Sequence, residues 1–73
     1  MNRKEWDQTM PSILAALEPG EHSLRDIMLS RLNRGPQAHE GVFLCQDIAM
    51  GRYPTISLNS WKNADGACTY TVQ

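Results

Sequence analysis

The chain has 73 residues, of which 41% are hydrophobic, and a formal net charge of −1 from 7 basic and 8 acidic side chains. This length suits one small domain over residues 1–73, and the hydrophobic content argues against a disordered chain. The near-neutral charge argues against a protein that binds nucleic acid through overall positive charge. No apolar run is long enough to cross a bilayer and no apolar segment follows Arg3 and Lys4, so we expect a cytoplasmic protein.

An apolar stripe in the first part of the chain predicts a helix over about residues 4–17. The stripe consists of Trp6, Met10, Ile13, Leu14 and Leu17. Pro11 interrupts it, because proline lacks the amide hydrogen that a helix interior needs. Two alternatives stay open: one helix that kinks at Pro11, or a second helix that Thr9 caps with Pro11 in its first turn. Pro19 and Gly20 end the helix, and residues 18–22 are expected to form a tight connection.

Residues 23–35, SLRDIMLSRLNRG, predict a short helix with both ends marked. Ser23 can cap the first free amides, and Asp26 lies in the first turn, where a carboxylate is favourable. Gly35 and Pro36 stop the helix. Its apolar stripe consists of Leu24, Ile27, Met28 and Leu32. We expect a basic outer face opposite this stripe, formed by Arg25, Arg31 and Arg34.

Residues 39–51 fit two kinds of secondary structure. Val42, Cys45, Ile48 and Ala49 fall on one helical face, whereas Val42, Leu44, Ile48 and Met50 alternate as in a strand. The length of the segment and its alanine favour a helix, the third of the chain.

Residues 53–73 predict a β-hairpin. Ile56 and Leu58 alternate with polar residues in its first strand, and Cys68, Tyr70 and Val72 do so in its second. Residues 62–66, with Asp65-Gly66, are suited to the turn. A lone hairpin is marginally stable, so it must pack on the helices. We expect its last strand to offer an unpaired edge to a partner strand.

The predicted fold is therefore α+β, with three short helices followed by a C-terminal β-hairpin. One core is expected, formed by Leu14, Leu17, Leu24, Ile27, Met28, Leu32, Val42, Ile48, Ile56 and Leu58. The order of elements resembles that of winged-helix and related helix-turn-helix domains in topology and length. This resemblance implies that the third helix would enter the major groove of DNA. Here that helix carries Glu40 and Asp47 and no lysine or arginine, so we expect phosphates to repel it.

The sequence contains no pattern typical of a catalytic, cofactor or metal site. The candidate zinc ligands His22, His39, Cys45 and Cys68 include no Cys-x-x-Cys and no His-x-x-x-His pair. Both cysteines fall on apolar faces, so we expect reduced, unreactive thiols. The glycines form no phosphate-binding motif. We therefore expect no enzyme activity, no cofactor and no metal.

The most favoured function is that of a small non-enzymatic regulatory protein that acts through contact with another protein. We expect a partner with an acidic surface, because arginine pairs with carboxylates in bidentate geometry. The expected contact residues are Arg25, Arg31, Arg34, Arg52, Tyr53, Trp61 and Lys62. The alternative is a winged-helix or helix-turn-helix transcriptional regulator that binds DNA. The oligomeric state stays open.

Overall fold

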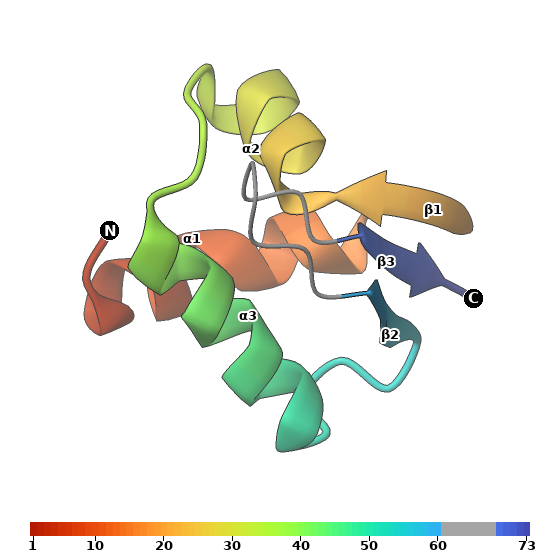
Figure 1. Ribbon diagram of the computed structural model, residues 1–73. Helices are drawn as coiled ribbons and strands as arrows, with labels where there is room; N and C mark the ends of the chain where they lie inside the picture. Colours follow the sequence, from red (N-terminus) through yellow and green to blue (C-terminus); the bar gives the residue numbers. More distant parts are fainter. Residues whose placement is uncertain (61–68) are drawn as a thin grey trace.

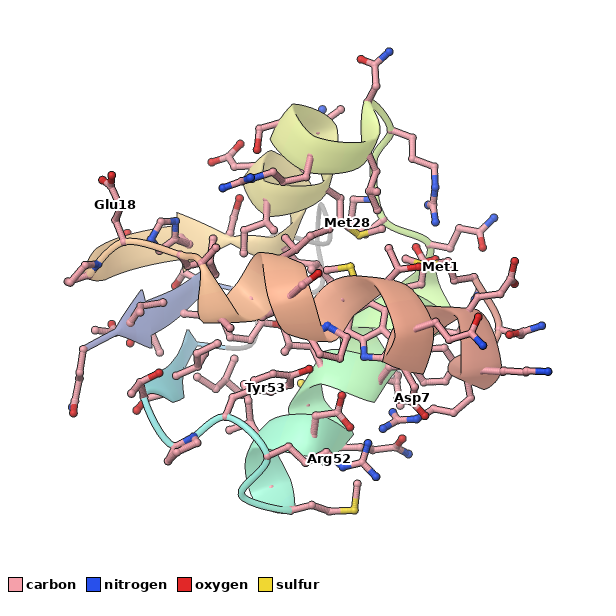
Figure 2. The ribbon with its side chains drawn as sticks, turned by 180° about the vertical axis from the view of Figure 1, so that it is seen from behind. Met1, Asp7, Glu18, Met28, Arg52 and Tyr53 are labelled. Carbon is pink, nitrogen blue, oxygen red and sulfur yellow. The ribbon has the colours of Figure 1, made fainter. Side chains whose placement is uncertain are left out.

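The computed structural model describes residues 1–60 and 69–73, which form a small α+β domain (Figure 1). In chain order the elements are α1 (Arg3–Ala15), β1 (Gly20–Ser23), α2 (Leu24–Leu32), α3 (Ala38–Ala49), β2 (Ile56–Ser60) and β3 (Thr69–Val72). The strands form one antiparallel sheet in the order β1-β3-β2. Figures 1 and 2 show α1 and α3 crossing each other, with the sheet beside the C-terminal end of α1. The α+β class is thus confirmed.

The sheet differs from the expected hairpin because it has a third strand. β1 overlaps the segment expected to be a tight connection, residues 18–22, and extends to Ser23; its residues pair with β3 from Gly20 opposite Val72 to Ser23 opposite Thr69. Gly20 has a φ of 132°, which glycine tolerates best. β3 is therefore the middle strand, and the expectation of an unpaired edge there is wrong.

β2 and β3 are the two strands that the sequence did predict. They pair from Ile56 opposite Val72 to Leu58 opposite Tyr70, and the register shifts between Leu58 and Ser60. The predicted turn at residues 62–66 and the predicted strand position Cys68 lie outside the described residues.

α1 is assigned as one helix that continues through Pro11, so Thr9 lies inside it and does not begin a second helix. Its first turn is closed by a capping box. The Glu5 amide donates to Asn2 Oδ1 at 2.8 Å, and the Asn2 amide donates to Glu5 Oε1 at 2.9 Å. The burial of Trp6, Met10 and Leu14 then secures the helix against the core.

α2 begins as predicted. The Asp26 amide donates to Ser23 Oγ at 3.1 Å, which satisfies one of the free amides of the first turn. The helix ends earlier than Gly35 and Pro36, because Asn33 adopts the left-handed conformation with a φ of 59°. Asparagine is one of the few residues other than glycine that tolerates this conformation.

α3 is a helix, as the length of its segment predicted, but it buries a different face. Glu40, Leu44 and Asp47 are buried, whereas Val42 is 44% exposed. The predicted face was wrong because an apolar pattern assigns carboxylates to solvent. Here the carboxylates have charged partners inside the fold.

The core contains five of the ten predicted residues as buried side chains: Leu14, Leu24, Ile27, Met28 and Ile56. Leu17, Leu32 and Ile48 are half-buried against it. Val42 and Leu58 are exposed, which corrects the prediction for both. The core is completed by Trp6, Met10, Leu44, Tyr70 and Val72.

Candidate interaction surfaces

The predicted basic outer face of α2 is not one surface. Arg25 and Arg31 are both exposed, but a helical period of 3.6 residues separates their directions by about 120°. Arg31 lies beside Ile27 in a hollow between α1, β1 and α2, whose lining does not include Arg25. Arg34 comes after the end of α2 and turns toward α3.

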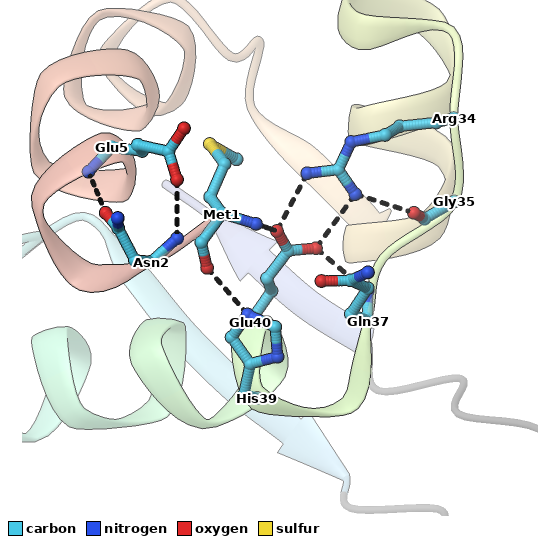
Figure 3. Close-up of polar contacts among 8 residues, drawn as sticks. All are labelled: Met1, Asn2, Glu5, Arg34, Gly35, Gln37, His39 and Glu40. Atoms are coloured by element: carbon cyan, nitrogen blue, oxygen red, sulfur yellow. Dashed lines mark hydrogen bonds and ion pairs between the residues drawn. The ribbon is translucent and has the colours of Figure 1, made fainter.

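Arg34 forms a two-pronged ion pair with Glu40. Its Nη1 donates to Glu40 Oε1 at 3.0 Å and its Nη2 donates to Glu40 Oε2 at 2.8 Å (Figure 3). The Gln37 amide donates to Oε1 at 2.8 Å, and the Met1 amino group pairs with Oε2. Burial alone would raise the pKa of Glu40, but the hydrogen bonds from Arg34, Gln37 and Met1 lower it to about 2. Glu40 is therefore an ionised group inside the fold, and Arg34 is engaged with it.

Asp47 holds the other part of α3 against α1. The indole Nε1 of Trp6 donates to Asp47 Oδ2 at 2.9 Å, and the Arg3 guanidinium pairs with Oδ1. The Arg52 guanidinium lies 3.6 Å from Asp47 Oδ1 and 3.4 Å from Asp7 Oδ1. Figure 2 shows Arg52 and Asp7 near each other on this side of the molecule. Arg52, a predicted contact residue, is therefore already paired with two carboxylates.

These two carboxylates explain the outer surface of α3. Because Glu40 and Asp47 point into the fold, none of the exposed residues of the helix is an aspartate, glutamate, lysine or arginine; they are Ala38, His39, Val42, Gln46 and Ala49. Met50, the C-cap residue, is 59% exposed. The expectation that this helix presents two carboxylates to solvent is therefore wrong. The apolar pattern of the sequence did not reveal that Glu40 and Asp47 are buried. The signal that could have indicated Asp47 is Trp6, because a buried tryptophan usually needs a hydrogen-bond acceptor.

The remaining predicted contact residues have different environments. Tyr53 is half-buried and packs against the core, and burial raises the pKa of its hydroxyl. Trp61 and Lys62 lie outside the described residues.

The histidines interact with backbone oxygens. His22 Nε2 lies 2.7 Å from the Glu18 carbonyl oxygen, and His39 Nε2 lies 2.6 Å from that of Met1. Cys45 is half-buried on α3, and Cys68 is outside the described part of the chain. Within residues 1–60 and 69–73, His, Cys, Asp and Glu side chains form no group of three or more that could hold a metal ion. In the same residues, no helix has the length and apolar character needed to span a membrane.

No family model, curated protein or solved structure matches this chain. A function is therefore inferred from the surface chemistry and from the arrangement of the elements.

Proposed function

We propose that this protein is a small non-enzymatic binding protein that regulates another protein by direct contact. The observation that carries this proposal is the outer face of α3, where the exposed side chains include no aspartate, glutamate, lysine or arginine. Val42 on this face is 44% exposed, and Met50 at its end is 59% exposed. The centres of protein interfaces are depleted in charged residues and enriched in methionine. A neutral, partly apolar helix surface on a charged domain fits such a centre.

The proposed partner has an acidic surface around this contact. Arg25 and Arg31 are exposed and form no ion pair with another described residue, so each can receive a carboxylate of a partner, on two separate parts of the α2 surface. Arg34 and Arg52 already bind carboxylates of their own chain, which leaves them a smaller part in the contact. Trp61 and Lys62 remain proposed contact residues.

Charge reversal on α3 tests this proposal. Val42→Glu should abolish capture of a specific protein from a lysate, because it places a carboxylate in an uncharged contact facing an acidic partner. The matched control is Gln8→Glu, which adds the same charge at an exposed position of α1. Both variants should keep the thermal stability of the parent, since both positions are exposed. Capture of the same proteins by the parent and by both variants would refute a contact through α3.

Winged-helix DNA binding is the second candidate function, and the order of the elements favours it. α2 and α3 follow each other across a short turn, and two strands come next, which resembles the winged-helix order. The inward direction of Glu40 and Asp47 removes the repulsion expected from the sequence. In this alternative Gln46 would be placed to pair with an adenine edge in the major groove.

A salt titration separates the two candidates. Binding to a fluorescent DNA duplex should be measured by anisotropy over a range of salt concentrations. A DNA-binding protein loses affinity steeply, with a logarithmic slope of about −0.9 for each phosphate contact. We expect no such salt-dependent binding, because most of the described arginines already pair with carboxylates. Tight binding with a steep slope would replace the protein-contact proposal with the DNA alternative.

A further inference from the structure

A hollow of about 370 Å³ opens between the end of α1, β1 and α2. This volume lies at the lower end of the range of about 300–1,000 Å³ that is typical of small-molecule sites. Leu17 and Ile27 give it an apolar lining, and Ile27 is buried in the core beneath. His22 stands at the β1 side, where its Nε2 contacts the Glu18 carbonyl oxygen at 2.7 Å and ties the chain after α1 to the strand.

The rim of this hollow carries charges of both signs. Glu18, Asp26 and Arg31 all line it, and all three are exposed. Figure 2 shows the Glu18 side chain directed into solvent beside β1. None of the three forms an ion pair with another described residue, whereas Arg3, Arg34 and Arg52 all do. The rim therefore has two carboxylates and one guanidinium that a ligand can pair with.

The spacing of these charges sets the size of a ligand that would use them all. Asp26 and Arg31 both line the hollow. They are five positions apart on α2, which separates their α carbons by about 7.5 Å along the helix axis and their directions by about 140°. A single amino acid carries its ammonium and carboxylate on one α carbon. A dipeptide has two α carbons about 3.8 Å apart, with a charged group beyond each of them. Flexible side chains at the rim can close the remaining distance.

We propose that this hollow binds a short apolar peptide with free ends, of about dipeptide size. The ligand ammonium pairs with Asp26 or Glu18, its carboxylate pairs with Arg31, and its apolar side chain lies over Leu17 and Ile27. The hollow is lined by residues 16–18 after α1, by His22 of β1 and by α2, so it lies outside the proposed contact through α3, and Arg31 is the residue that both proposals use.

NMR titration of the ¹⁵N-labelled protein with leucyl-alanine tests it. Saturable shifts are expected for the amides of Leu17, Ile27 and Arg31. Blocking the ligand ammonium by acetylation, or its carboxylate by amidation, should weaken binding about fivefold in each case, the loss expected for one exposed ion pair. Free leucine should also bind more weakly, because its charges cannot reach both ends of the rim.

Variants on α2 provide the matched comparison. Arg31→Gln should weaken leucyl-alanine about fivefold. Arg25→Gln removes the same charge from the same helix outside the hollow and should leave the affinity unchanged. Absence of saturable shifts would overturn the proposal, and so would equal binding of the free and blocked peptides. Preferential binding of a doubly blocked peptide would also overturn it, because the occupant would then be an internal segment of a protein.

Discussion

Glu40 is a charged residue that this small domain buries completely, with a relative exposure of 0%. Burial of an ionised carboxylate is costly unless other groups replace its hydration. Here Arg34, the Gln37 amide and the Met1 amino group do so from three directions. Arg34 therefore belongs to the interior of the fold as much as to its surface, and it should not behave as a solvated arginine.

Removing the guanidinium tests this role. Arg34→Gln should lower the free energy of unfolding by about 2 kcal/mol, because Glu40 loses its two charge-assisted hydrogen bonds. Arg31→Gln is the control, since Arg31 is exposed and should change stability by less than about 0.5 kcal/mol. Urea denaturation of both variants measures the difference. Equal stability of the two would show that Arg34 contributes nothing to the fold.

The low pKa of Glu40 also predicts how stability depends on pH. Its pKa falls from 4.5 to about 2 on folding, so its contribution is complete above pH 4.5 and is lost as the pH falls toward 2. This contribution is about 3 kcal/mol at neutral pH. Glu40→Gln should therefore flatten the acid side of the stability curve, measured by urea denaturation at about pH 6 and about pH 3. Glu18→Gln, at an exposed position, should leave the curve unchanged. An equal loss of stability between these pH values in the parent and in both variants would contradict the role given to Glu40.

At the scale of the element, α3 is oriented by two polar contacts and one apolar one. Glu40 and Asp47 anchor it to Arg34 and to α1, and Leu44 lies between them in the core. The helix is thereby rotated away from the orientation that its apolar residues alone would favour. Val42 reaches the surface for this reason, where it is available for the proposed contact.

Two alanine variants distinguish these orientations. Leu44→Ala should cost about 2–5 kcal/mol, the usual range for truncation of a buried leucine. Val42→Ala should cost less than about 0.5 kcal/mol, because that side chain is exposed. Chemical denaturation gives both values. The reverse order would restore the face that the apolar pattern predicted.

At the scale of the whole molecule, the sheet joins segments that are distant in the chain. β1 pairs with β3, and β3 also pairs with β2. The short β1 cannot be stable alone, so its existence depends on the chain after Tyr53 having folded against it. The contact between β1 and β3 is thus a tertiary feature rather than a local one.

Native-state hydrogen exchange tests this arrangement. As the middle strand of the described sheet, β3 should have protected amides at successive positions, because alternate amides point to β1 and to β2. β1 should show protection only at alternate positions. Alternate protection in β3 would instead indicate a two-stranded hairpin and would remove β1 from the sheet.

The sequence by itself determined the α+β class, the start of α2 directly after its cap Ser23, and the helical nature of residues 39–49. These features depend on local signals, namely a cap, an apolar period and segment length, which act over a few residues. Only the tertiary structure decided the strand at residues 20–23, the buried face of α3 and the partner of Arg34. Each of these depends on a group far away in the chain or on another element. The strand β1 needs β3 to pair with, the burial of Asp47 on α3 needs Arg3, and Arg34 finds its partner in Glu40 of α3. A carboxylate is stable inside a protein only where a partner neutralises it, and the position of that partner exists only after the chain has folded.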